Sequence, residues 1–551
     1  MSCLSKGVVF VYKIFINGKI ATMEKNMPLV EAVVVSKGKI VYAGSNKEAL
    51  KHQKPNSMVV DLKGKLMVPG LIDSHMHLLN LGSSMQNIDL SGIESIAELK
   101  AQIYDFIKNN NIEPGKWTLG CGWNQDHFDI KVFPDRYDLD EVSEDHPIMI
   151  TRACGHAVVV NSKALELCGI DRNTKQVEGG AIDLDDAGEP NGIFRENAIS
   201  MVYEAIPKDD VESIKEMIIS AQEKALSCGI TSVQSDDLQS ASGLGFEEVI
   251  QAYKELAAEG RMKIRLYEQC LLPTMEELKS FFDKGYYPGW EDRTFKLGPL
   301  KLLTDGSLGA RTAYMTLPYE DAPDSCGICI YSQGELDELV AYAHERNMSA
   351  AIHCIGDKAM YMAFDSIDRA KNDMPDKHVR HSIVHCQITD EKLLDKFKES
   401  DVIAHVQPIF LDYDLHIVED RIGAERAKRT YNWKSLIDRG VHTAFGSDCP
   451  VEPCNVMHGI YAAVTRKDLR GYPAGGWLPE QKISVEEALY GFTMGAAYAS
   501  FEENIKGSVK AGKLADFTVL SEDIFEIEPD KIKDVEVAAT IINGEIMWGS
   551  L

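Results

Sequence analysis

The middle of this chain contains eight short apolar runs, separated by longer segments in which apolar residues recur at helical spacing, such as ELDELVAYAHERN at 335–347. Strands that alternate with helices favour a parallel α/β architecture, and eight such strands are the number that closes a barrel. The fold class predicted is therefore α/β, a (β/α)₈ TIM barrel. The eight runs are LIDSHMH (71–77), TSVQSD (231–236), IRLYEQCLL (264–272), LGPLKLLTDG (297–306), SAAIHC (349–354), SIVHC (382–386), VIAHVQP (402–408) and HTAFGSD (442–448).

The two ends of the chain share another pattern, in which apolar and polar residues alternate on either side of glycine-containing turns. Such turns between period-2 runs predict β-hairpins. The turns are Asn17-Gly18, Lys37-Gly38, Lys63-Gly64 and Asn543-Gly544. We expect residues 12–68 and 508–551 to form one composite β-sandwich beside a barrel domain of residues 69–507.

The gap between the first and second apolar runs is far too long for one helix. It predicts an insertion after the first barrel strand, a subdomain of residues 80–228. Its DDAGEPNG stretch at 185–192 is typical of a loop with tight turns.

Charge and composition restrict the partners and the compartment. The net charge is −27, and an acidic body repels nucleic acid and anionic membranes. No apolar run reaches the roughly 18 residues that a membrane span needs, and the start, MSCLSKGVVFVYKIFING, is typical of a strand rather than a signal peptide. The 12 cysteines are scattered, which predicts reduced thiols and a cytoplasmic location. The partners we expect are a small-molecule substrate and a second copy of the chain, which would form a homodimer.

His75 and His77 lie two residues apart in the first run. Side chains at this spacing on a strand face the same side, so both imidazoles can reach one metal ion. An H-x-H pair alone is weak evidence in a chain with 15 histidines. Its context, VPGLIDSHMH with Asp73 inside the strand, strengthens the metal hypothesis.

Three more residues that could bind a metal lie at the ends of apolar runs: His353, His385 and Asp448. A barrel collects such residues at one point, because its active site lies at the C-terminal ends of the strands. One such histidine is more often a satisfied core or loop residue. Four histidines and an aspartate, all at strand ends, predict a metal site.

Lys301 lies within the fourth run, where a charged amine is costly to bury. It either snorkels or pairs with an acid, for which Asp305 is the obvious counter-ion, or it loses its proton and reacts with CO₂. The resulting carbamate can bridge two metals. Asp305 is then a competing ligand or a substrate contact.

The segments VPGLIDSHMH, LKLLTDGSLGART, AIHCIGDKA, IVHCQ and AFGSDCPVEP together resemble the amidohydrolase superfamily, and in particular its YtcJ-like branch, which includes N-substituted formamide deformylases. The resemblance extends from about Asn17 to Gly544 and includes GWNQDHF (122–128) in the insertion. It implies that one or two divalent metals, most simply Zn²⁺, are held at the barrel mouth. The implied ligands are His75, His77, Lys301 (carbamylated in many relatives), His353, His385 and Asp448, and the implied substrate contacts are His156, Trp123, Asp305 and Arg311.

This site predicts a metal-dependent hydrolase that cleaves an amide-like C–N bond of a small molecule. A divalent metal lowers the pKa of bound water toward about 7, which supplies hydroxide at neutral pH. Asp448 is expected to be the catalytic base and then the acid that protonates the leaving amine.

Two alternatives remain open. One is a metal-dependent deaminase, or another hydrolase of this superfamily, that acts on a heterocycle. Those relatives have a His-x-x-Glu pattern at the fifth strand, whereas this chain has Gly356 there. The other is a binding protein built on an inactive barrel, which the intact ligand set disfavours and a metal-free purified protein would support.

Overall fold

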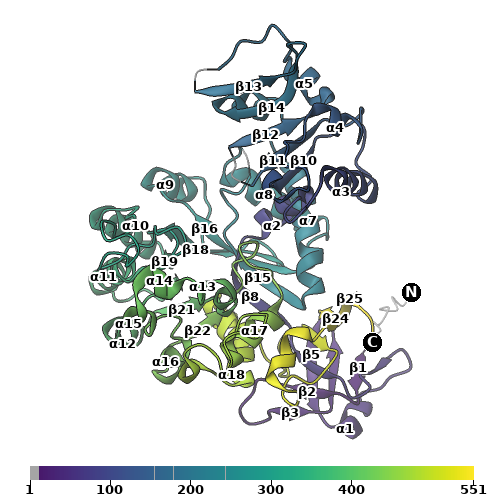
Figure 1. Ribbon diagram of the computed structural model, residues 1–551. Helices are drawn as coiled ribbons and strands as arrows, with labels where there is room; N and C mark the ends of the chain where they lie inside the picture. Colours follow the sequence, from purple (N-terminus) through teal and green to yellow (C-terminus); the bar gives the residue numbers. More distant parts are fainter. Residues whose placement is uncertain (1–11, 154–155, 178, 242) are drawn as a thin grey trace. The chain divides into compact units, whose positions relative to one another are not determined.

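The computed structural model describes residues 12–153, 156–177, 179–241 and 243–551 (Figure 1). The chain divides into two compact units. One contains the chain up to Asn80 and from Ile214 onward, and the other is Leu81–Ser213. Of the strand expected near the start, residues 1–11 lie outside the described part, and β1 begins at Lys13.

The larger unit is built on a parallel sheet whose strands follow the chain order β8-β15-β16-β18-β19-β20-β21-β22 (Figure 1). All eight strands overlap the eight apolar runs, so the predicted barrel is confirmed. Their bounds are β8 (Leu71–Met76), β15 (Ile230–Ser235), β16 (Arg265–Leu271), β18 (Phe295–Leu303), β19 (Ala350–Cys354), β20 (Ser382–His385), β21 (Ile403–Val406) and β22 (Thr443–Phe445). The short β17 (Gly289–Trp290) pairs antiparallel with β18.

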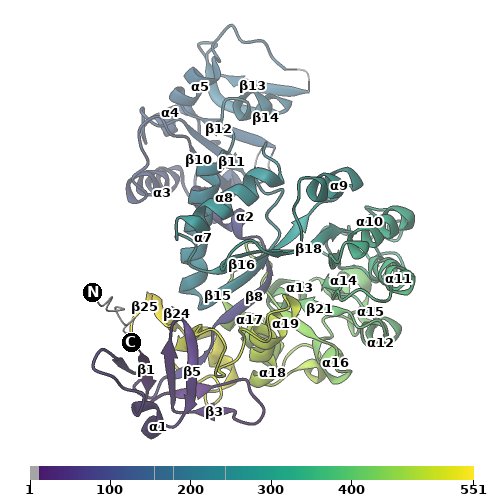
Figure 2. The same cartoon turned by 180° about the vertical axis from the view of Figure 1, so that it is seen from behind.

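Amphipathic helices connect these strands and cover the outside of the sheet (Figure 2). Several begin at a side-chain cap that satisfies a free backbone N–H, as Ser332 does for α10 and Asp390 does for α12. Each buries its apolar stripe against the strands. The principal ones are α7 (Val211–Ser227), α8 (Phe246–Ala258), α9 (Met275–Asp283), α10 (Gln333–Glu345), α11 (Asp357–Asp373), α12 (Glu391–Glu399), α16 (Trp433–Asp438), α17 (Val456–Thr465) and α18 (Val485–Tyr490).

The barrel closes where the chain after β22 meets β8. Asp448 donates its backbone N–H to the carbonyl of His75 (2.8 Å), and His77 donates to the carbonyl of Cys449 (2.7 Å). The buried Asp73 carboxylate accepts the hydroxyl and the backbone N–H of Ser447. Gly446 permits this approach, because a Cβ there would lie 2.6 Å from the backbone nitrogen of His75.

Two further sheets pack face to face beside the barrel. Their orders are β5-β4-β1-β6 and β25-β24-β23-β7-β2-β3. The second sheet joins strands from both ends of the chain, and Phe15 meets Phe517 in the shared core at 6.0 Å between ring centroids. The bounds are β1 (Lys13–Ile16), β2 (Lys19–Ala21), β3 (Leu29–Val30), β4 (Ala32–Ser36), β5 (Lys39–Gly44), β6 (Met58–Asp61), β7 (Leu66–Pro69), β23 (Phe517–Leu520), β24 (Val537–Ile542) and β25 (Glu545–Gly549).

Two of the four expected hairpins are present. β4 pairs with β5 and β24 pairs with β25, both antiparallel. The hairpins expected at Asn17-Gly18 and Lys63-Gly64 were wrong. There the chain crosses from one sheet to the other, so that β1 pairs parallel with β6 and β2 pairs parallel with β7. The two strands that flank such a turn have apolar residues at alternate positions in both arrangements, whether they pair in one sheet or face each other across a core. The sequence pattern therefore does not distinguish the two.

The Leu81–Ser213 unit has its own sheet and apolar core. The sequence-based range of 80–228 also includes α7, which belongs to the barrel unit. The strand order is β13-β14-β12-β11-β10-β9. The bounds are β9 (Asn87–Asp89), β10 (Thr118–Trp123), β11 (Ile148–Arg152), β12 (Ala157–Val160), β13 (Gly180–Leu184) and β14 (Pro190–Glu196), with α3 (Ile96–Asn109) and α5 (Ser162–Cys168) as the longer helices.

The ten cysteines in the described part are free thiols. Cys326 and Cys329 form a C-x-x-C spacing that the expectation of scattered cysteines overlooked. Cys329 turns its thiol to the carbonyl of Tyr331, so this spacing does not form a disulfide here. Within the described residues, no helix is long and apolar enough to cross a membrane.

A buried ion pair ties the barrel to the C-terminal strands and gives a stability prediction. Arg265 of β16 donates to both carboxylate oxygens of Asp516, at 2.9 and 3.1 Å. Asp516→Ala would leave a buried guanidinium unpaired, so we expect a loss of about 3–5 kcal/mol of unfolding free energy in denaturant titration. Asp530→Ala, which breaks an exposed pair with Lys467, should cost at most about 1 kcal/mol. Equal effects of the two substitutions would contradict this assignment.

Candidate metal centre

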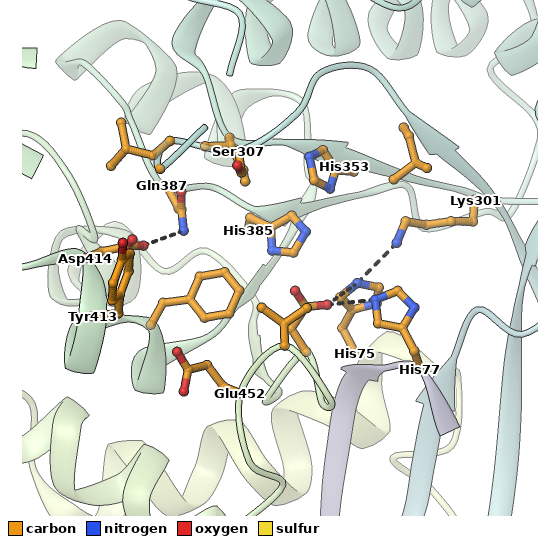
Figure 3. Close-up of a pocket in the computed structure, with 17 residues that line it drawn as sticks. His75, His77, Lys301, Ser307, His353, His385, Gln387, Tyr413, Asp414 and Glu452 are labelled. Carbon is orange, nitrogen blue, oxygen red and sulfur yellow. Dashed lines mark hydrogen bonds and ion pairs between the residues drawn. The ribbon is translucent and has the colours of Figure 1, made fainter. Parts of the chain in front are cut away.

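A cavity of about 380 Å³ opens at the C-terminal ends of the barrel strands (Figure 3). Its wall includes all six expected metal ligands: four lie on β8, β18, β19 and β20, His77 directly follows β8, and Asp448 follows β22. The lining thus brings together His75, His77, Lys301, His353, His385 and Asp448. Convergence of these residues from five separate segments is what their positions at strand ends predicts.

His75 is fully buried, and both of its ring nitrogens have partners. Nδ1 lies 2.8 Å from Oε1 of Gln269 on β16, which can only accept, so Nδ1 holds the proton. Nε2 therefore has a free lone pair on the cavity side. Burial, and next the charge of Lys301, lower the pKa of His75, which keeps the ring neutral.

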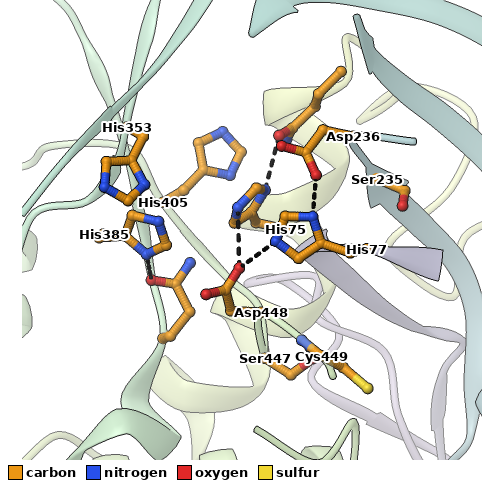
Figure 4. Close-up of polar contacts among 12 residues, drawn as sticks. His75, His77, Ser235, Asp236, His353, His385, His405, Ser447, Asp448 and Cys449 are labelled. Atoms are coloured by element: carbon orange, nitrogen blue, oxygen red, sulfur yellow. Dashed lines mark hydrogen bonds and ion pairs between the residues drawn. The ribbon is translucent and has the colours of Figure 1, made fainter. Parts of the chain in front are cut away.

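His77 lies between two carboxylates (Figure 4). Its Nε2 is 3.0 Å from Oδ1 of Asp448, and its Nδ1 pairs with Asp236. Burial alone would lower the pKa of His77, but the two acids outweigh it and raise that pKa to about 10. Two carboxylates around one imidazole mark a place where positive charge is stabilised.

Asp448 joins the two histidines of β8. The same Oδ1 atom is 3.2 Å from Nε2 of His75 and 3.0 Å from Nε2 of His77. Burial opposes its ionisation, yet the contacts with His75 and His77 hold the pKa of Asp448 well below its usual range. The group is therefore a carboxylate, and no described residue makes a hydrogen bond to its Oδ2.

Lys301 pairs with Asp236, which follows β15, and not with Asp305 as the sequence suggested. Its Nζ donates to Oδ2 of Asp236 at 2.7 Å and lies 3.1 Å from Nε2 of His75. Burial raises the pKa of Asp236, but the charge of Lys301 and then that of His77 lower it below the usual value. The expected counter-ion was wrong because Asp236 reaches the same point from the end of β15, two strands away from β18 in the sheet.

His385 closes the site from the other side. Its Nδ1 lies 2.9 Å from Oε1 of Gln407, which fixes the proton on Nδ1 and leaves Nε2 as a ligand. Burial, and then the charge of His353, hold the pKa of His385 well below its usual value. Its backbone has φ 79° and that of Asp448 has φ 63°, a left-handed conformation that strains a non-glycine residue.

His353 and Asp305 form a second layer next to this group. The His353 ring lies 4.4 Å from that of His385, with Nε2 3.1 Å from the carbonyl of Gly306 and 3.3 Å from Asp305. Asp305 accepts the backbone N–H groups of Ile355 and Gly356 at 3.1 and 2.7 Å. Asp305 is thus an anchor for the loops that frame the cavity, and its role as a substrate contact stays a prediction.

Two ligand groups fit a metal ion. In each, the candidate ligand atoms lie within 4.8 Å of one another: His75, His385 and Asp448 in one group, and His75, His77 and Asp236 in the other. Around a tetrahedral ion with bonds of about 2.1 Å, ligand atoms are about 3.4 Å apart. The 3.2 Å between His75 Nε2 and Asp448 Oδ1 fits that requirement. Nitrogen and carboxylate donors with fixed tautomers suit a divalent cation.

Three other expected substrate contacts have neighbours within their own parts of the chain. Trp123 is fully buried in the core of the Leu81–Ser213 unit, with its ring 5.2 Å from that of Phe133. His156 of the same unit is exposed and pairs with Glu196 at 3.0 Å. Arg311, in the loop after β18, forms a two-pronged ion pair with Asp321. Their roles toward a substrate stay predictions.

Three residues of the site were missed from the sequence. Asp236 ends the second apolar run just as Asp448 ends the eighth, so its signal was present. Gln269 and Gln407 gave no comparable signal, because an amide inside an apolar run is compatible with many buried hydrogen bonds.

The family follows from comparison with known proteins. Residues 58–547 match the model of the amidohydrolase family, which spans the barrel, the insertion and the C-terminal strands. The chain belongs to that family. It is therefore a metal-dependent hydrolase that acts on C–N bonds, and its candidate groups of histidine and aspartate ligands suit that chemistry.

Individual relatives agree along the whole chain. The protein is 32% identical over 536 residues to YtcJ of Bacillus subtilis, a candidate amidohydrolase, covering 96% of this chain and 98% of the relative. It is 26% identical to the N-substituted formamide deformylase of Arthrobacter pascens, over 97% of each chain. An uncharacterised metal-dependent hydrolase of Pyrococcus furiosus superposes with a TM-score of 0.75 at 31% identity, covering 94% of this amidohydrolase and all of the other.

The hydrogen bond from His75 to Gln269 gives a prediction on metal affinity. Gln269→Leu keeps the side-chain volume but removes the acceptor that fixes the tautomer of His75, so we expect metal affinity to fall about 10- to 100-fold. Chelator competition on the metal-loaded protein measures this. Gln239→Leu, on the surface, is the matched control, and an unchanged affinity in Gln269→Leu would show that Gln269 does not orient the ligand.

Proposed function

We propose that this amidohydrolase cleaves an N-formyl or N-acyl derivative of a small amine with bound Zn²⁺, in the cytoplasm. The observation that supports the proposal most is the ligand group of His75, His385 and Asp448 at the barrel mouth. Imidazole and carboxylate ligands suit Zn²⁺ best among common divalent ions. Similarity to a formamide deformylase favours an acyl group on nitrogen, and the free cysteines suit a reducing compartment.

When bound, the metal lowers the pKa of water and polarises the scissile carbonyl. The chain's own part is proton transfer by Asp448. Its Oδ1 accepts from Nε2 of His77 and faces Nε2 of His75, so Oδ2 is the atom that accepts the proton from the attacking water. The same oxygen then returns that proton to the leaving nitrogen, which departs as a neutral amine.

Lys301 is proposed to be carbamylated and to hold two metals together with the histidines. An ammonium about 4 Å from a divalent ion would be repelled by about 8 kcal/mol at an effective dielectric of about 20. Nζ lies only 3.1 Å from Nε2 of His75, so Lys301 is close to any ion on that nitrogen. Conversion to an anion removes the repulsion and supplies two oxygen ligands.

The proposed reaction is tested by a screen of metal-loaded protein against N-formyl amines, N-acyl amines, dipeptides and lactams, with amine release as the readout. Asp448→Asn should lower kcat/KM on any substrate found by a factor of about 10² to 10⁴, and metal analysis should accompany the assay because Asp448 is also a ligand candidate. Asp420→Asn, on an exposed helix, should match the wild type. An Asp448→Asn variant with full metal content and wild-type rate would remove Asp448 from the mechanism.

The carbamate gives a second prediction. Lys301→Ala should be inactive and partly rescued by short carboxylic acids, while the wild type binds close to two metals per chain. Lys301→Arg preserves the cation beside Asp236 but cannot form a carbamate, so it should be inactive without rescue. One metal per chain, together with an active Lys301→Arg variant, would instead indicate a single-metal site with an ion pair.

A further inference from the structure

The cavity has an acidic and aromatic half that the proposed mechanism does not use. Gln387, Tyr413, Asp414 and Glu452 lie on its far side from His77 and Lys301 (Figure 3). They come from the segment after β20, from α13 (Leu411–Asp414) and from the loop that follows Asp448. No hydrogen bond or ion pair joins these four side chains to the candidate metal ligands.

Among the described residues, one polar atom of the Gln387 side chain has a hydrogen-bond partner and the other has none. Its Nε2 donates to Oδ2 of Asp414 at 3.2 Å, and the hydroxyl of Tyr431 donates to the same oxygen at 2.5 Å. Because Asp414 accepts from both, the amide nitrogen faces it and Oε1 is turned away. Gln387 is only 3% exposed, and in the described part of the chain nothing donates to this Oε1. A buried acceptor without a donor costs about 1–3 kcal/mol, which a donor from a ligand would recover.

Glu452 adds a third acidic side chain near this half, beside Asp412 and Asp414, and a bound cation would favour its ionised form. Burial, and then the charges of Asp412 and Asp414, raise the pKa of Glu452 to about 7. Lys301 is the only lysine or arginine among the described residues that line the cavity, and it is paired with Asp236. Phe410 and Tyr413 supply aromatic surface, which attracts cations through the ring quadrupole.

We propose that this half of the cavity binds a cationic nitrogen of the substrate, which donates N–H to Oε1 of Gln387 and is balanced by the carboxylate of Glu452. The inference rests on the proposed function and narrows it: the substrate is an acylated amine with a second, positively charged nitrogen. An anionic or purely apolar substituent would leave the acceptor unpaired and the acids uncompensated.

Ligand binding tests the subsite without catalysis. Benzamidinium is a planar cation with N–H donors, and acetophenone is a neutral analogue of similar shape. In calorimetry with the metal-loaded full chain, we expect benzamidinium to bind at least about tenfold more tightly. Glu452→Gln and Gln387→Leu should each weaken benzamidinium about tenfold, the range for hydrogen bonds to charged groups, and leave acetophenone within about twofold.

Glu399→Gln, on the exposed face of α12, is the control and should change neither affinity. Equal affinities of the two probes for the wild type, or variants that weaken both probes alike, would overturn the subsite. A failure of the proposed hydrolysis can be distinguished from a failure of the subsite. Selective benzamidinium binding without turnover of any acylated amine would refute the reaction and keep the subsite, whereas turnover without preference for a second cationic nitrogen would do the reverse.

Discussion

The contact between β8 and the chain that follows β22 determines both the barrel and its metal site. Asp448 can meet His75 and His77 only because its own backbone N–H is bound to the carbonyl of His75. The same stretch is held by the Asp73 carboxylate, which accepts twice from Ser447. Closure of the sheet and assembly of the ligands are therefore one event, and a barrel that failed to close would also lack its ligand cluster.

The site combines several features that lower the stability of the folded state, and the rest of the fold must offset their free energy. His385 and Asp448 both have positive φ, which costs of order 1–3 kcal/mol each. Lys301 and Asp236 are buried charges that are stabilised chiefly by each other. Such an arrangement is stable only inside a large, well-packed body.

The barrel was predictable from the sequence because buried parallel strands leave an unmistakable alternation of apolar runs and helical stretches. The candidate ligands gave a signal because most of them end a run, although Lys301 lies within one. The sequence did not predict which segments pair with one another. Asn17-Gly18 reads as a hairpin turn whether the chain returns to the same sheet or crosses to the facing one. The partner of Lys301 depended on which of Asp236 and Asp305 points inward, which strand order alone does not decide. Gln269 and Gln407 act through a single hydrogen bond each, and no spacing rule identifies them.

The composite sandwich has a consequence for how the chain acquires its structure during synthesis. β7 leads directly into the first barrel strand, yet its neighbour on one side is β23, near the other end of the chain. Until β23 has left the ribosome, β7 presents an open strand edge and the aromatic face of Phe15 has no Phe517 against it. Nascent chains emerge from the N-terminus first, so the earliest segment made is among the last to be completed. Until then the edge presents unpaired backbone N–H and C=O groups, the feature that promotes pairing between chains and aggregation.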